Sequence, residues 1–92
     1  MADGVEVNTL CSENNQTMGL YRFASNTTYP DHLHEGPEFV YLLEGSFCQN
    51  GQWVEAGGAR VGETGSIDKG FISGNNGCLF LSVYIASKYS NR

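Results

Sequence analysis

The sequence has few charged residues and no cluster of basic ones. Only 16% of its 92 residues are charged, and five basic residues are scattered among ten acidic ones, for a net charge of −5. Binding to nucleic-acid phosphates requires grouped lysine and arginine side chains. The sequence therefore predicts no nucleic-acid partner.

Long apolar stretches are also missing. No segment approaches the roughly 20 consecutive apolar residues that a membrane-spanning helix needs. Residues 1–8 show neither the basic region nor the apolar centre of a secretion signal. We therefore expect no membrane partner and a cytoplasmic location.

Cysteine is too sparse and too widely spaced to build a framework. The three cysteines are odd in number and form no CxxC pair: Cys11, Cys48 and Cys78. This pattern indicates neither a disulfide scaffold nor a thiolate zinc site. We expect free thiols that pack as small hydrophobic side chains.

Helical periodicity is absent as well, and what remains is typical of strands. No segment repeats its apolar residues with the period of an amphipathic helix over three turns, whereas 12 glycines and 12% aromatic residues stand among short apolar runs. Antiparallel strands in a chain of this length must close or stack, because an open sheet exposes its edges and one apolar face. We predict a single all-β domain over residues 1–92, a small antiparallel β-barrel or jelly roll of about eight strands with its core at about 18–86.

The clearest predicted strand is residues 38–44, which Gly45 ends. Val40 and Leu42 share the parity of Glu38, so we expect them to face the interior. The other parity is apolar too and needs a cover, either the N-terminal strand or a second copy of the chain, over Phe39, Tyr41 and Leu43. Farther along, Asn50-Gly51 predicts a tight hairpin turn, and residues 78–86 predict a closing strand.

The two histidines of the chain lie close together in the sequence. His32 and His34 are two residues apart, so in a strand both side chains project from one face, about 7 Å apart. Glu38 follows the turn-forming Gly36-Pro37, and its carboxylate can return to the same side. Two imidazoles and a carboxylate suit Zn, Fe, Mn or Ni as the ligated divalent ion. The alternative is a solvated pair of surface histidines.

This segment resembles the first conserved motif of the cupin superfamily, G-x5-H-x-H-x3-4-E-x6-G. Every internal spacing is met at His32, His34, Glu38 and Gly45, whereas Asn26 occupies the position of the leading glycine. The sequence around and after this motif is most similar to that of small cupins. Examples are the zinc-binding ChrR-type anti-sigma-factor domain and related small dioxygenases that cleave acetylacetone or dihydroxyacetophenone. The resemblance spans roughly residues 18–84 and implies the cupin double-stranded β-helix.

The second cupin motif, G-x5-P-x-G-x2-H-x3-N, is only partly matched. Gly57 and Gly65 fall on its glycines, but Asp68 stands at the position of the third histidine and Ile72 at that of the final asparagine. Asp68 can complete a site of two histidines and two carboxylates, which favours harder metals. It can equally be a solvated turn residue beside an empty site.

The resemblance leaves several functions open. A divalent ion at His32, His34, Glu38 and Asp68 would support a protein that acts on or senses a small-molecule ligand. The alternative is a metal-free cupin that binds or interacts without catalysis, in which the histidines charge to compensate the carboxylates. The resemblance also implies a homodimer, and it does not decide whether the chain is an enzyme.

Overall fold

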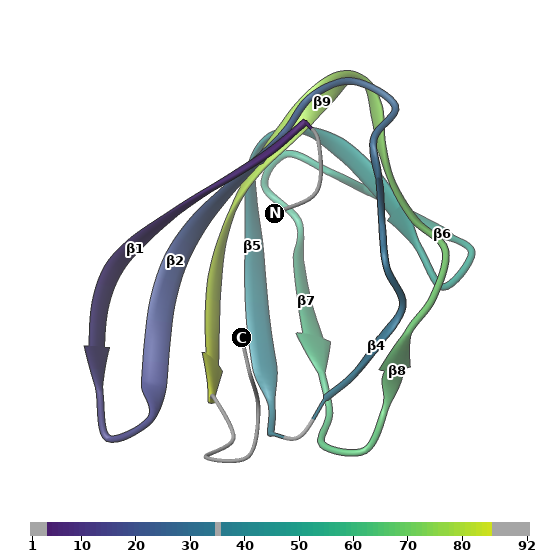
Figure 1. Ribbon diagram of the computed structural model, residues 1–92. Coiled ribbons are helices and arrows are strands. Elements are labelled where there is room, and N and C mark those ends of the chain that lie inside the picture. The colour runs from purple at the N-terminus through teal and green to yellow at the C-terminus, as the bar shows by residue number, and fades with distance from the viewer. Residues whose placement is uncertain (1–3, 35, 86–92) are drawn as a thin grey trace.

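The computed structural model describes residues 4–34 and 36–85, including the backbone but not the side chain of His32. All of its regular structure is β (Figure 1). The strands are β1 (Val5–Glu13), β2 (Gln16–Phe23), β3 (Thr28–Tyr29), β4 (His32–Leu33), β5 (Glu38–Gln49), β6 (Gln52–Glu55), β7 (Ala59–Gly62), β8 (Ile67–Asp68) and β9 (Phe71–Ile85).

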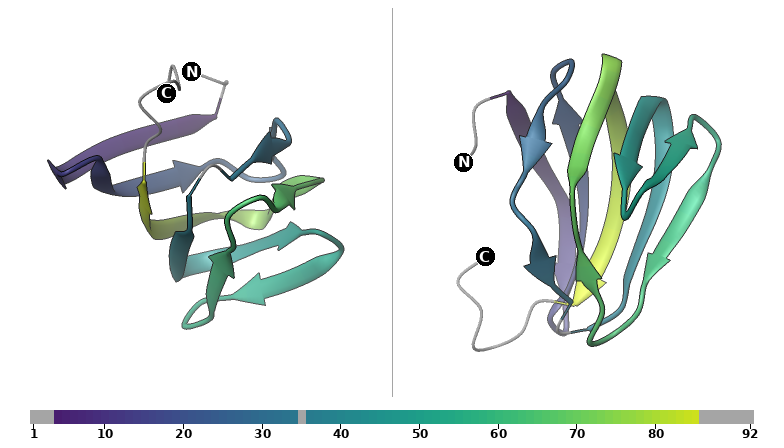
Figure 2. Two further views of the ribbon diagram at one scale, coloured as in Figure 1. Left: turned by 90° about the horizontal axis from the view of Figure 1, so that it is seen from below. Right: turned by 90° about the vertical axis from the view of Figure 1, so that its right-hand side faces the viewer.

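Every strand pair is antiparallel, as predicted. A seven-stranded sheet has the order β1-β2-β9-β5-β6, with β3 paired to β9 and β7 paired to β5. The two remaining strands, β4 and β8, form a separate two-stranded sheet. The large sheet curls so that the small one faces it (Figure 2). The expected all-β, antiparallel fold is thus confirmed.

The hairpin predicted at Asn50-Gly51 is present, but two predicted strand ends are wrong. Asn50 and Gly51 have φ values of 51° and 76°, as the tight turn between β5 and β6 requires. Gly45 does not end β5. It has a φ of 78°, and a Cβ there would collide with the carbonyl oxygen of Gly77, so this glycine forms an irregularity where β5 crosses β9.

The closing strand also begins earlier than expected, at Phe71 and not at Cys78. The extra residues include the fully buried Ser73, whose hydroxyl donates to the carbonyl oxygen of Ala24 at 2.6 Å. The same hydroxyl accepts a bond from the amide of Thr27 at 2.8 Å. These hydrogen bonds hold a glycine-rich, polar segment in the sheet. The composition of the segment does not reveal them, so the sequence did not predict a strand there.

An aromatic cluster forms the core at one end of the interior. Phe23, Phe47, Phe71 and Phe80 are each at most 8% exposed, and their ring centroids lie 4.7 to 6.3 Å apart. Leu42 beside them is fully buried, as the parity of β5 predicts. The inward positions nearer the start of β5 and the end of β9 include the polar Glu38 and Ser82, and the candidate site lies there.

The outer face of the large sheet carries an apolar band in two rows. The strand registers align Met18, Val83, Phe39 and Val61 in one row, and Leu20, Leu81, Tyr41 and Ala59 in the next. Phe39, Tyr41 and Val61 are 56%, 45% and 54% exposed. The N-terminal strand does not cover this band, because β1 extends the sheet edgewise beside β2; that alternative is wrong.

The cysteines are free thiols in three environments. Cys11 is exposed, Cys48 half-buried and Cys78 buried, so the expected absence of a disulfide holds among them. Burial raises the pKa of the Cys78 thiol to about 11. No helix in the part of the chain that the structure describes is long and apolar enough to cross a membrane.

Candidate metal centre

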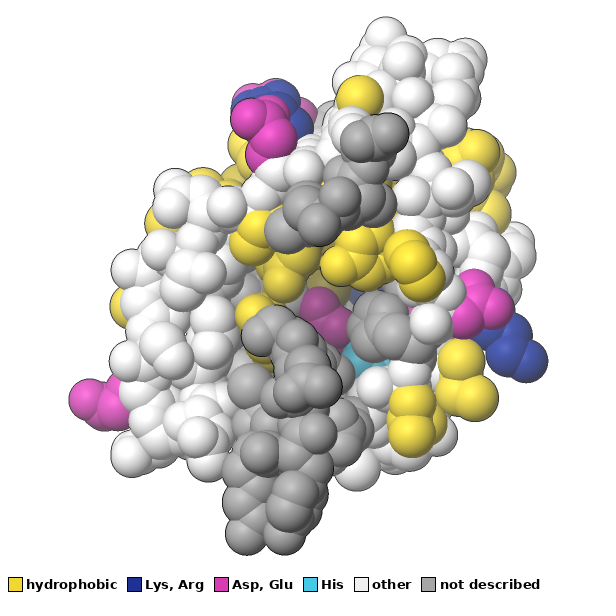
Figure 3. All heavy atoms as spheres, viewed as in Figure 1, with side chains coloured by type: hydrophobic (Ala, Val, Ile, Leu, Met, Phe, Trp, Pro, Cys, Tyr) yellow, Lys and Arg dark blue, Asp and Glu magenta, His cyan; other side chains and the backbone are white. Residues whose placement is uncertain are grey.

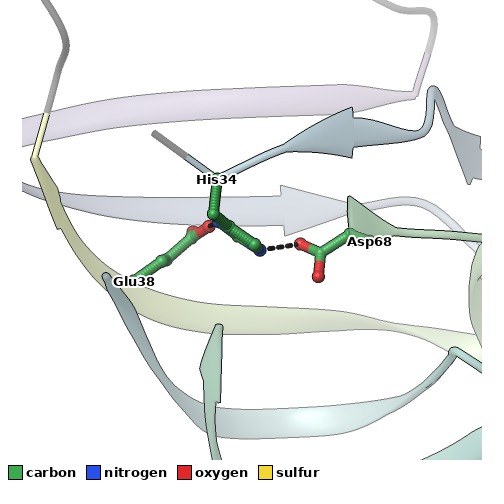
Figure 4. A group of neighbouring side chains, drawn as sticks. All are labelled: His34, Glu38 and Asp68. Atoms are coloured by element: carbon green, nitrogen blue, oxygen red, sulfur yellow. Dashed lines mark ion pairs between the residues drawn. The ribbon is translucent and has the colours of Figure 1, made fainter. Parts of the chain in front are cut away.

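Three segments bring one side chain each to the polar end of the interior. Asp68 lies on β8, Glu38 begins β5, and His34 directly follows β4 (Figure 4). The ladder between β4 and β8 continues past the strands, because the amide of His34 donates to the carbonyl oxygen of Ser66 at 2.9 Å. The amide of Gly65 in turn donates to the carbonyl oxygen of His34 at 2.8 Å. These backbone bonds fix His34 opposite Ser66, two residues before Asp68 on the same face of the ladder.

The imidazole of His34 lies between the two carboxylates. Its Nε2 atom is 2.8 Å from Oδ2 of Asp68, and its Nδ1 atom is 3.4 Å from Oε1 of Glu38. The His34 residue is only 3% exposed. One donor atom from each of the three residues lies within 4.8 Å of the donor atoms of the other two.

Ser82 forms a hydrogen bond with the other carboxylate oxygen of Glu38. The Ser82 hydroxyl donates to Oε2 of Glu38 at 2.5 Å, and Ser82 is fully buried on β9. Sequence reasoning missed this residue. The sequence does contain a sign of its role. In the apolar run from Leu79 to Ile85, Ser82 is the one polar residue besides a tyrosine, and its parity is that of the inward-facing Phe80.

Gly62 is a second residue that the sequence did not reveal. It pairs with Glu38 across β5 and β7, and a Cβ atom there would collide with Nε2 of His34. The backbone of Gly62 therefore forms the wall against which the imidazole rests. Because the motif position of Gly62 carries no requirement, only the register of β5 with β7 identifies its role.

Two tyrosines stand beside the site. Tyr84 pairs with Glu38 across β9 and β5, and Tyr21 lies on the adjacent β2. Burial raises the pKa of Tyr21 well above its usual range, and the hydrogen bond to Tyr84 and the negative charge of Glu38 raise it further. The Tyr21 phenol thus stays neutral and forms a hydrogen bond with Tyr84 near the carboxylate.

A cavity of about 280 Å³ adjoins the three residues. Its other polar lining includes Gln49, Arg60 and Ser66. A space-filling view shows acidic and histidine side chains at the floor of a hollow bordered by hydrophobic side chains (Figure 3). A small molecule that entered the cavity would therefore directly contact the group of His34, Glu38 and Asp68, which we call the His34 cluster.

The donors present suit a divalent ion. An imidazole nitrogen and carboxylate oxygens bind Zn, Fe(II), Mn and Ni. Two ligands at about 2.1 Å from an ion and at right angles to each other lie about 3 Å apart, and the 2.8 Å between His34 Nε2 and Asp68 Oδ2 agrees with that spacing. Glu38 contacts the opposite nitrogen of the ring, so it lies beside the imidazole and not beside that shared position.

Of the four residues predicted as ligands, the structure brings His34, Glu38 and Asp68 together. The fourth, His32, has its backbone in β4, paired with Asp68, while its side chain lies outside the part that the structure describes. Its role as a ligand stays a prediction. Asp68 is half-buried and contacts His34, which contradicts the alternative of a solvated turn residue.

Comparison with known structures identifies the fold. A chain of the complex of Rhodobacter sphaeroides SigE with the anti-sigma ChrR is similar at a TM-score of 0.83 and 20% identity, covering 91% of this chain and 46% of that one. An acetylacetone dioxygenase from Acinetobacter johnsonii gives 0.80 and 16% identity, with coverages of 89% and 60%. The polyketide cyclase RemF from Streptomyces resistomycificus gives 0.82 and 22% identity, with coverages of 96% and 69%.

At these identities the structural likeness establishes the fold, and the chain spans less than two thirds of the first two proteins. A search of curated proteins gave no match. A family profile described as the ChrR cupin-like domain matches residues 1–86, nearly the whole chain. The chain therefore belongs to the ChrR cupin-like domain family.

Proposed function

We propose that this cupin domain binds one divalent metal ion at the site formed by His34, Glu38 and Asp68, with His34 and Asp68 as ligands and Glu38 supporting the imidazole, and that the ion and the adjoining cavity bind a small molecule. The observation that carries the proposal is the convergence of three donors, from three segments, within 4.8 Å at the wall of a cavity. From its place in the sequence motif, we propose His32 as a further ligand. The ion would be Zn, Fe, Mn or Ni.

The geometry favours different roles for the two carboxylates. Nε2 of His34 and Asp68 face each other, so both are suited to the ion directly. Glu38 lies on the Nδ1 side and is anchored by Ser82, an arrangement that holds a proton on Nδ1 and presents Nε2 as a ligand. Direct ligation by Glu38 would require its carboxylate to swing past the ring.

A bound ion would polarise an oxygen of the small molecule as a Lewis acid. The residues that line the cavity would position that molecule. An acetylacetone dioxygenase and a polyketide cyclase are among the structurally similar proteins. Their names favour a ligand with oxygen donors, whether the domain senses it or converts it.

One observation favours a second candidate, a metal-free binding module. Each ring nitrogen of His34 has a carboxylate oxygen near it, at 2.8 and 3.4 Å. A doubly protonated imidazole would satisfy both carboxylates without any ion. The two candidates therefore differ in the protonation of one ring.

Metal binding separates the candidates. The chelator-treated protein should take up one equivalent of at least one of Zn, Mn, Ni or Fe(II), measured by elemental analysis after dialysis, and its melting temperature should rise. Asp68→Ala should weaken binding about 10–100-fold or more. Glu63→Gln, which removes a cavity carboxylate outside the three-residue group, is the matched control and should bind normally. No uptake and an unchanged melting temperature would favour the metal-free module.

We also propose that the outer apolar band pairs with a second copy of this chain. The apolar rows cross four strands and form a contiguous exposed apolar patch, a feature that marks interaction surfaces. Arg22 and Glu44 lie beside this band and 3.7 Å apart, on β2 and β5 to either side of β9. A two-fold axis along β9 would place each Arg22 opposite the partner subunit's copy of Glu44, so the charges are self-complementary.

Mass measurement in solution tests this pairing. The protein should be a dimer, and Phe39→Glu should convert it to a monomer. Trp53→Glu is the matched control, because Trp53 is 60% exposed but lies on β6 outside the band. Arg22→Glu and Glu44→Arg should each weaken the dimer, and the double exchange should restore it. A monomeric parent protein, or two single exchanges without effect, would contradict the pairing.

A further inference from the structure

The cavity beside the candidate metal centre contains an arginine that the proposed metal site does not use. Arg60 is half-buried on β7, two residues before Gly62, so the two share the inner face of that strand. Arg60 pairs with Val40 in the same register that pairs Gly62 with Glu38. Arg60 therefore lines the cavity one row away from the His34 cluster.

The charges around the cavity explain what this arginine can do. Its described lining has three carboxylates, those of Glu38, Glu63 and Asp68, and Arg60 is its only permanently charged cation. Among the described residues, no carboxylate forms an ion pair with Arg60. A divalent ion at the His34 cluster would offset the excess negative charge, and the guanidinium then remains available for an anionic ligand.

Neighbouring polar groups fit the same purpose. Gln49 lies two residues beyond the buried Phe47 on β5 and is among the residues that line the cavity. Its side-chain amide can both donate and accept hydrogen bonds. Asn50 is occupied elsewhere, because its Oδ1 accepts a bond from the amide of Lys69 at 2.8 Å. Arg60 and Gln49 are thus the groups suited to orient the far end of a ligand.

We propose that the ligand is a short organic acid with two polar ends. One end places an oxygen at the ion held by His34 and Asp68, and the other is a carboxylate that Arg60 binds through its paired N–H groups. Residues two apart in a strand are about 7 Å apart, which sets the separation of the ends. The cavity of about 280 Å³ lies at the lower limit of small-molecule pockets and restricts the acid to a short chain. This inference rests on the proposed metal centre.

Two probes of equal length test the role of Arg60. Succinic monohydroxamate carries a metal-binding hydroxamate and a carboxylate, whereas butyrohydroxamate has a methyl group in place of the carboxylate. Calorimetric titration of the zinc-loaded protein, with zinc retention verified afterwards, should show the first probe binding about 10–100-fold more tightly. Arg60→Gln should abolish this preference, and Arg60→Lys should restore part of it. Lys69→Gln, at an exposed cation outside the cavity lining, should leave it unchanged.

The outcomes separate this inference from the metal proposal. Equal preference for the carboxylate probe in the parent protein and in Arg60→Gln would overturn the role of Arg60 while zinc binding stands. If the protein takes up no metal, the metal proposal fails, and the metal-free protein is titrated with butyrate and with neutral butyramide. Butyrate binding that Arg60→Gln abolishes would support the anion site on its own. Absence of such binding would overturn it.

Discussion

The two ends of the barrel interior use the same strands for opposite purposes. At one end, β5 and β9 contribute Phe47, Phe71 and Phe80 to a cluster of stacked and tilted rings. At the other end, the same two strands present Glu38 and Ser82, joined by a hydrogen bond of 2.5 Å. Burial of apolar surface stabilises the fold, whereas burial of ionisable groups costs free energy that only partners offset. We infer that the aromatic end carries the stability and the polar end carries the function.

Truncation at the aromatic end should have the largest effect. Phe47 is 1% exposed, so Phe47→Ala should lower the free energy of unfolding by about 3–5 kcal/mol through lost burial and a cavity. That loss is a large part of the stability of a small domain. Urea denaturation followed by circular dichroism measures it. The exposed Trp53 supplies the control: Trp53→Ala should change the free energy by about 0.5 kcal/mol or less, and an equal loss in the two variants would contradict the division between the ends.

Crowding the polar end should disable the site while the fold survives. Gly62→Ala places a methyl group against Nε2 of His34, so the imidazole must turn away from Asp68. We expect metal affinity to fall by about 10–100-fold, the range seen when ligand orientation is lost. Calorimetric titration with zinc measures the affinity, and circular dichroism verifies the fold. Ala59→Gly, on the same strand as Gly62, is the control. Gly51→Ala is unsuitable as a control, because an alanine would be strained at the φ of 76° that Gly51 adopts. Unchanged affinity in Gly62→Ala would show that Nε2 is not a ligand.

Removing the support behind Glu38 should have a smaller effect. Ser82→Ala deletes the hydroxyl that donates to the Glu38 carboxylate, while the small side chain leaves the packing of β9 largely intact. A hydrogen bond to a charged group contributes about 1.5–3 kcal/mol, and metal affinity should fall by about tenfold. The same titration measures this change. Ser66→Ala, whose hydroxyl donates to the carbonyl oxygen of Glu63, is the matched control. A loss confined to Ser66→Ala would refute the role of Ser82.

A further effect, at the buried Cys78, appears only at high pH. Burial raises the pKa of Cys78 to about 11 from a usual value of 9.0. Above pH 9 the thiol ionises in the unfolded chain but not in the folded one, so the contribution of Cys78 is complete below pH 9 and declines as the pH rises towards 11. The free energy of unfolding of the parent protein minus that of Cys78→Ala should therefore fall across this interval. Cys11→Ala, at an exposed site, should show no such trend, and a flat difference for Cys78 would contradict its burial.

The comparison also explains what the sequence could predict. Alternation along β5 placed Val40 and Leu42 inside and Phe39 outside, because period two is a local property of a strand. The spacing of His34 and Glu38 likewise indicated a shared site. Asp68 lies far along the chain, and the motif resemblance alone pointed to it; the pairing of β4 with β8 brings it to His34.

Other features depend on tertiary register and were beyond prediction. Gly62 and Ser82 join the site because β7 and β9 flank β5 in a particular alignment, which no single segment encodes. The departure at Asn26 is explained by conformation: its φ is 50°, a left-handed value that glycine adopts freely and asparagine tolerates. The substitution in the first motif thus preserves the backbone turn before the site.

The central claim is that Nε2 of His34 binds a metal ion. Its most direct test is nitrogen-15 NMR of the His34 ring, with the signals assigned through His34→Gln and recorded before and after one equivalent of Zn(II). The account predicts that Nε2 moves to a metal-bound shift while Nδ1 keeps its proton beside Glu38. Two protonated nitrogens that do not change with zinc would contradict it and identify the ring as an imidazolium between two carboxylates.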